Sequence, residues 1–203
     1  GKGDSLFIMS DGGASRFLES VETTNLTEEM YKYTITADTS QGKKNWKCDL
    51  NGLIYLHDFL KERPNIKFIV IDSVKSMLSG TPFKYTDNEQ ADLIIGFLRE
   101  IIAEPLQVSI MLLSHNSTGG ESSSGAKRWN EACGWVAQIK KVKEGENIND
   151  KQRKLCVWKD PRSGRRVFDY EIKDGIFVPV YNSDMKGDCF GELQQFIQQT
   201  ESR

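Results

Sequence analysis

Four groups of polar residues follow apolar runs in this sequence, and their side chains are of kinds that handle phosphate groups. The groups are Asp11; Asp72 with Ser73; His115 with Asn116; and Lys159 with Arg162. Carboxylates bind Mg²⁺, and a cation beside a transferring phosphoryl group stabilises its charge. These residue types are typical of a nucleotide site, provided that the fold brings the groups together.

The run from Phe68 to Ser73 shows how the fold does this. Its β-branched and aromatic residues end on a lone carboxylate and then a hydroxyl, which predicts a buried strand that delivers an acid to a sheet edge. Similar apolar runs occupy residues 5–10 and 108–114, and helical spacing lies between the runs. This alternation predicts an α/β fold with a mostly parallel sheet flanked by helices. Parallel strands end at one edge, so the first three groups should converge there.

The remaining segments complete the predicted organisation. Residues 31–36 alternate like an edge strand, and Thr86 with Glu89 forms a capping box that opens a helix over 88–103, which Pro105 should end. Residues 143–152 are expected to form a charged loop. The predicted later elements are an antiparallel strand region over 154–180 and a terminal helix over 188–199.

Composition limits the class of protein. The chain has 203 residues, 38% hydrophobic and 28% charged, which favours a single globular domain over 1–203. The net charge of −2 provides no general basic field for nucleic acid. Apolar runs are too short for a membrane span, and we expect a cytoplasmic protein. The four cysteines are widely separated, which favours reduced thiols over a zinc site or disulfides.

Three segments carry a resemblance to a known family. They are Met9-Ser10-Asp11, Ile69-Val70-Ile71-Asp72-Ser73 and Leu112-Leu113-Ser114-His115-Asn116. Over about residues 5–178 the sequence resembles the RecA-like ATPase core of ring-forming replicative helicases of the DnaB and RepA type. The resemblance implies ATP and Mg²⁺ as cofactors, with Asp72 holding the metal and Ser73 beside it. It also implies that Asp11 orients the attacking water and that His115 senses the γ-phosphate.

Each of these assignments has a simpler alternative. Asp11 stands where the family has a longer acid, so it must reach farther, and an acid after a strand is often a turn former or a helix cap. His115 also fits an ordinary exposed histidine. The segment 158–164 resembles the family's K-x-R segment, which implies that Lys159 and Arg162, with Arg165 as the fallback, reach the nucleotide of a neighbouring subunit. The same residues also suit a hairpin turn.

The expected partners are single-stranded DNA and other copies of the chain in a ring, most simply a hexamer. The resemblance implies that residues 117–125 face the central channel, where Lys127 and Arg128, with Lys84, would contact DNA phosphates. An ordinary solvated linker has the same composition as residues 117–125.

A phosphate loop of the form G-x-x-x-x-G-K-[ST] is absent from these residues. Without its backbone N–H groups and Lys, nucleotide affinity should be very weak and this chain alone inactive. The resemblance places the phosphate-loop strand between the strands of Asp72 and His115. We therefore expect that these residues are the carboxy-terminal part of a longer polypeptide, or that another segment supplies the strand.

Three functions remain open from the sequence. The first is a DNA helicase motor in replication, as in phage, plasmid or mobile-element systems. The second is a recombinase-like or clock-protein-like RecA ATPase that does not unwind DNA. The third is a scaffold without catalysis that oligomerises or binds a partner.

Overall fold

The computed structural model describes residues 3–10, 19, 22, 33–36, 46–115, 125–144, 147–160, 164, 166–173 and 176–180. The chain divides into two compact units, which are described separately: Gly1–Val136 with Lys159–Arg162, and Ala137–Trp158 with Ser163–Arg203. The predicted roles of Asp11, Arg162 and Arg165, and the predicted helix over 188–199, lie outside the described residues.

The first unit contains a parallel sheet. Its strands lie in the order β2-β1-β3-β4. Their bounds are Asp4–Met9 for β1, Tyr33–Thr36 for β2, Ile66–Asp72 for β3 and Ser109–Leu113 for β4. Each neighbouring pair is parallel. The predicted α/β sheet is confirmed, and residues 33–36 form its edge strand as expected.

One expectation about strand order is wrong. We expected a phosphate-loop strand between the strands of Asp72 and His115, but β3 and β4 pair directly. The register is continuous from Phe68 with Ser109 to Asp72 with Leu113. Because this ladder has no gap, a further strand can join the sheet only at an outer edge.

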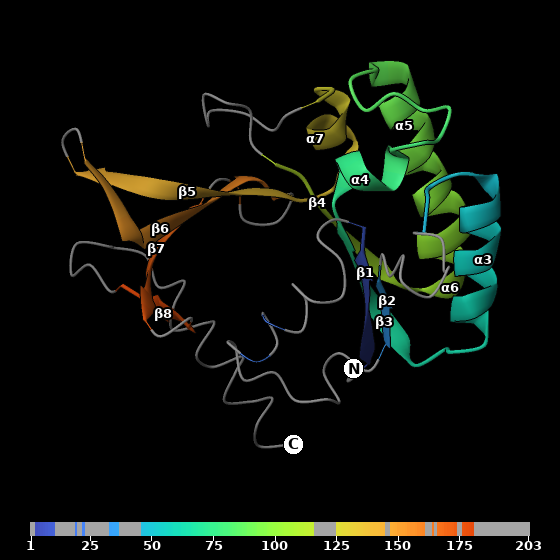
Figure 1. Cartoon of the computed structure of the whole chain (residues 1–203), viewed down its shortest axis with the longest axis horizontal. Coiled ribbons are helices and arrows are strands. Elements are labelled where there is room, and N and C mark those ends of the chain that lie inside the picture. The colour runs from blue at the N-terminus through green and yellow to red at the C-terminus, as the bar shows by residue number, and fades with distance from the viewer. Residues whose placement is uncertain are drawn as a thin grey trace. The chain divides into compact units, whose positions relative to one another are not determined.

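Helices cover the sheet on the side of its most buried side chains. Their bounds are α3 Leu50–Lys61, α4 Val74–Leu78, α5 Asn88–Phe97, η2 Leu98–Ala103 (a π-helical stretch), α6 Glu104–Leu106 and α7 Arg128–Ala132. In Figure 1, α3, α5 and α6 lie on one side of β1, β2 and β3. The core joins strand residues Leu6, Ile8, Ile69 and Ile71 to helix residues such as Leu56, all fully buried. This apolar burial is the main stabilising term.

The structure corrects two details of the long helical segment. Asp87, not Thr86, is the N-cap of α5, and its side chain accepts a hydrogen bond from Gln90 N at 3.1 Å. Aspartate caps as well as threonine does, so the sequence alone left two adjacent candidates. Pro105 lies within α6, and the helix ends at Gln107, whose φ is 54°. The first turn of a helix tolerates proline, because the missing N–H would have no partner there.

The second unit is a sheet of four strands in the order β5-β6-β7-β8. Its strands are β5 Val136–Glu144, β6 Asn147–Lys159, β7 Arg166–Lys173 and β8 Ile176–Pro179, and the β6–β7 and β7–β8 pairs are antiparallel. The predicted antiparallel region is confirmed. The loop expected over 143–152 is wrong, because β5 runs to 144 and β6 begins at 147. Cross-strand pairing holds a charged hairpin that composition alone assigns to a loop.

No helix in the described part of the chain is long and apolar enough to cross a membrane.

Candidate nucleotide site at the carboxyl edge of the sheet

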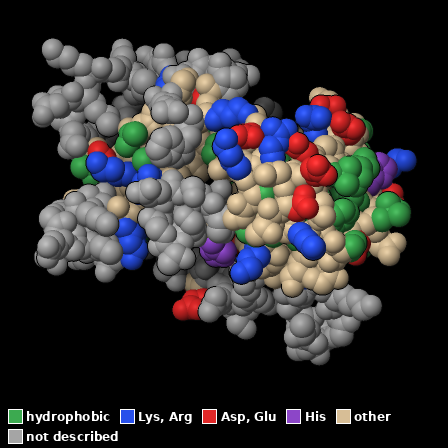
Figure 2. All heavy atoms as spheres, turned by 90° about the horizontal axis from the view of Figure 1, so that it is seen from above, with side chains coloured by type: hydrophobic (Ala, Val, Ile, Leu, Met, Phe, Trp, Pro, Cys, Tyr) green, Lys and Arg blue, Asp and Glu red, His purple; other side chains and the backbone are tan. Residues whose placement is uncertain are grey.

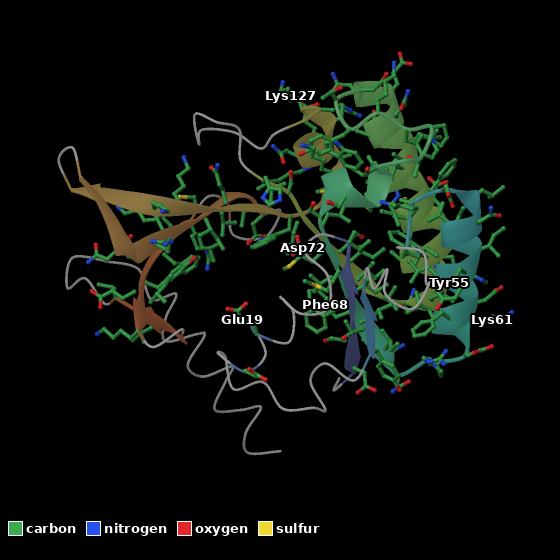
Figure 3. The ribbon with its side chains drawn as sticks, in the orientation of Figure 1. Glu19, Tyr55, Lys61, Phe68, Asp72 and Lys127 are labelled. Carbon is green, nitrogen blue, oxygen red and sulfur yellow. The ribbon has the colours of Figure 1, made fainter. Side chains whose placement is uncertain are left out.

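Three strands of the first sheet end at the same level. Met9 is opposite Asp72, and Asp72 is opposite Leu113. Beyond these residues Ser10 N donates a hydrogen bond to Asp72 O at 2.6 Å. Figure 3 shows Asp72 at one end of β3, with Phe68 farther along the strand. Adjacent strands lie about 4.8 Å apart, so this edge brings Ser10, Asp72 and Ser114 within about 10 Å.

Ser73 joins this edge to the helix that follows it. Its side chain is buried, and its carbonyl accepts a hydrogen bond from Met77 N at 2.9 Å, as the residue before α4 should. Its hydroxyl donates to Ser76 Oγ at 3.3 Å. The Asp72–Ser73 peptide is cis. Ser73 thus contributes a fixed turn below Asp72, and its hydroxyl already bonds within α4.

The oxygen atoms at this edge suit Mg²⁺. Asp72 supplies a half-buried carboxylate, and the hydroxyl of Ser10 is buried without a hydrogen-bond partner in the described structure. The described residues include no group of three or more His, Cys, Asp or Glu that could hold a metal. Magnesium in nucleotide enzymes is commonly held by one or two carboxylates together with substrate phosphates. Asp72 could fill that role, and the metal would neutralise phosphate charge when bound.

His115 lies at the same edge, two residues beyond the partner of Asp72. Its side chain is exposed. The Ser114 hydroxyl contacts the His115 carbonyl oxygen at 3.4 Å, and Tyr85 Oη lies 2.7 Å from Ser114 Oγ. The register therefore brings the candidate metal ligand and the candidate phosphate sensor together. Sequence reasoning did not identify Tyr85, whose only signal was an aromatic residue in a loop rich in Gly and Pro.

Lys159, which was predicted to reach a neighbouring subunit, makes contacts within its own chain. Its ammonium donates hydrogen bonds to Glu131 O at 2.7 Å and Cys133 O at 2.6 Å. These carbonyls lie at the end of α7, where a cation is favourable. The positive charge of Lys159 partly offsets the burial that raises the pKa of the Cys133 thiol. The contacts indicate that Lys159 caps α7.

Arg128 anchors α7 to α5. Its guanidinium donates to Asp92 Oδ2 from Nε at 2.8 Å and pairs with Glu131 at 3.2 Å, and its backbone N–H donates to Asn88 Oδ1 at 3.2 Å. The hydrogen bond to Asp92 is the main reason that the pKa of Arg128 is raised. Arg128 therefore has a structural role that the prediction of DNA contact did not include.

The other two predicted DNA contacts are more accessible. The Lys127 side chain is 82% exposed and pairs with Glu131 at 2.8 Å, a contact that lowers the pKa of Glu131. Lys84 is exposed in the loop before α5. On the described part of the face shown in Figure 2, Lys and Arg are interspersed with Asp and Glu. Any DNA contact would therefore depend on local cations.

Comparison with known proteins supports the fold assignment. No protein-family model and no curated protein matches this sequence. Similar solved structures include the KaiC-like protein PH0186 from the hyperthermophilic archaeon Pyrococcus horikoshii OT3, with a TM-score of 0.62 and 19% identity over 88% of this chain and 77% of that one. The ATPase domain of a DnaB-type helicase has a TM-score of 0.61 and 13% identity over 88% and 75%. The RadB recombinase has a TM-score of 0.55 and 13% identity over 89% and 80%.

These similarities and the parallel sheet define a RecA-like ATPase fold. They show the fold and leave the activity of this chain to the residues at the sheet edge.

Proposed function

We propose that this chain is the carboxy-terminal part of a RecA-like ATPase motor that hydrolyses Mg·ATP between identical subunits, in a ring that moves on single-stranded DNA. The observation that carries the proposal is the row formed by Ser10, Asp72 and Ser114–His115 at the ends of three adjacent parallel strands. Ligands of open α/β sheets bind outside this edge.

Within this site the residues have separate roles. Asp72 and the Ser10 hydroxyl supply oxygens for Mg²⁺ or its bound water, and Asp11 follows Ser10 as the group that orients water. His115 contacts the γ-phosphate from the neighbouring strand. Arg162 comes from the adjacent subunit and stabilises charge on the transferring phosphoryl group.

The phosphate loop completes the proposed site from outside these residues. The motif is absent from the sequence, and β3 and β4 leave no space between them. The outer edge of β4 fits an additional strand, because Met111 and Leu113 are apolar and 37% and 40% exposed. The coding sequence before Gly1 tests this proposal directly. A G-x-x-x-x-G-K-[ST] motif on a strand-to-helix turn supports it, and an initiation codon directly before Gly1 would favour a scaffold without catalysis.

A RecA-like ATPase that does not unwind DNA is the second candidate. The TM-scores of 0.62 for the KaiC-like protein and 0.61 for the helicase ATPase domain favour neither class. The deciding experiment measures ATP hydrolysis and strand displacement by the full-length protein on forked DNA. We expect both, with hydrolysis stimulated by single-stranded DNA. Hydrolysis without displacement on any fork would exclude the helicase, and absence of nucleotide binding would exclude both ATPases.

A further inference from the structure

Tyr85 lies in the loop between α4 and α5, and it contacts two segments that are distant in sequence. One is the end of β4 at Ser114, and the other is the start of α7 at residues 125–129. All of these residues belong to the first compact unit. Tyr85 therefore links the candidate nucleotide edge to the helix that follows Lys127.

The contact with β4 runs through hydroxyl groups. Tyr85 Oη lies 2.7 Å from Ser114 Oγ, and Ser114 Oγ donates to His115 O at 3.4 Å. When Ser114 donates to His115, its oxygen accepts from the Tyr85 hydroxyl. The result is a hydrogen-bonded chain from Tyr85 to the backbone of His115, and such chains strengthen cooperatively.

The contact with α7 uses the ring and backbone of Tyr85. Its carbonyl accepts hydrogen bonds from Trp129 Nε1 at 2.9 Å and from Ala126 N at 3.2 Å. Its ring stacks on the Trp129 indole, with centroids 6.1 Å apart and planes 26° apart. Gly125 approaches the ring so closely that a Cβ there would lie 2.8 Å or less from three ring carbons. Four contacts thus fix α7 to Tyr85.

The far side of α7 carries the proposed DNA contact. Lys127 precedes the helix and is exposed, while Arg128 and Trp129 hold the helix against α5 and Tyr85. A shift of Ser114–His115 therefore moves Tyr85, and Tyr85 moves the helix with Lys127. Coupling between sites requires a contiguous physical link of this kind that both ligands bias.

We propose that Tyr85 is a positioning residue that couples the nucleotide bound at His115 to the DNA affinity of Lys127. The proposal rests on the proposed ATPase function. By linkage, a bound nucleotide that changes DNA affinity does so by a fixed factor, and the DNA changes nucleotide affinity by the same factor. The Tyr85 hydroxyl transmits part of that factor.

The test measures this coupling factor in the full-length protein. The affinity for a fluorescein-labelled oligothymidylate is measured with and without Mg²⁺ and adenylyl-imidodiphosphate, and the ratio of the two affinities is the factor. Tyr85→Phe removes one hydroxyl and keeps the ring. We expect it to reduce the factor roughly two- to thirtyfold. Ser114→Ala should have the same effect, and the double variant should lose no more than either single variant.

The control is Tyr55→Phe, which removes a hydroxyl from an exposed position on α3 and should leave the factor unchanged. A coupling factor that Tyr85→Phe leaves at the wild-type value overturns the proposal, since a purely structural role would alter stability alone. Wild-type protein that binds neither probe refutes the ATPase function itself. In that case urea unfolding still decides the contact, because Tyr85→Phe and Ser114→Ala should each change the unfolding equilibrium about two- to fivefold without adding.

Discussion

Replacing Gly125 with alanine tests the packing of Tyr85 most sharply. Gly125 has a φ of +96°, and a Cβ at this position would lie 2.8 Å or less from three carbons of the Tyr85 ring. The ring has little room to retreat, since it stacks on Trp129 and its hydroxyl contacts Ser114. The substitution should therefore strain the backbone and displace the ring.

The expected cost has two parts. A side chain in the left-handed region costs about 1–2 kcal/mol, and overpacking costs about 1–3 kcal/mol. The loss of unfolded-state entropy on replacing glycine returns about 0.4–1 kcal/mol. Gly125→Ala should thus lower the free energy of unfolding by roughly 2–3 kcal/mol, measured by urea titration with an unchanged m-value.

Two other glycines separate these causes. Gly80 has a φ of +81° and no atom within 4 Å of an added Cβ, so Gly80→Ala should show the backbone cost alone, about 1 kcal/mol. Gly96 lies within α5 with open space around it, so Gly96→Ala should stabilise the protein by about 0.5–1 kcal/mol. If Gly125→Ala costs no more than Gly80→Ala, the close contact with Tyr85 is wrong.

Two further predictions concern Cys48 and Lys159. Burial, with a smaller contribution from Asp49, raises the pKa of the Cys48 thiol to about 12. Because the unfolded thiol ionises near pH 9, this contribution to stability is complete below pH 9 and is lost by about 1.4 kcal/mol per unit between pH 9 and 12. The difference in unfolding free energy between wild type and Cys48→Ala should fall with this slope, and a constant difference would contradict the burial. Lys159→Gln should lower stability by about 1 kcal/mol, because two helix carbonyls lose their donor; unchanged stability with impaired ATP hydrolysis would instead support a role in a neighbouring subunit.

Much of the fold could be predicted because its signals are local. The apolar run that ends at Asp72 defined β3, and the spacing of Leu53, Leu56 and Leu60 defined α3, whose inner face they form. Periodicity reports which residues are buried, so it located these elements well.

Long-range contacts were less accessible to sequence reasoning. The short helix α4, over Val74–Leu78, was missed because five residues are too few to show a period. The direct pairing of β3 with β4 depends on tertiary topology. Lys159 and Arg128 were assigned to ligands because a sequence shows their charge and does not show their partners Glu131 and Asp92.

The substitution Asp72→Asn tests the central claim most directly. In the full-length protein it should reduce Mg²⁺-dependent ATP hydrolysis by about 10²-fold or more, because the amide carries no charge for the metal. Asp58→Asn removes an exposed acid from α3 and should leave hydrolysis at the wild-type rate. Hydrolysis by Asp72→Asn at the wild-type rate, with the same Mg²⁺ dependence, would contradict the assignment of the sheet edge as the nucleotide site.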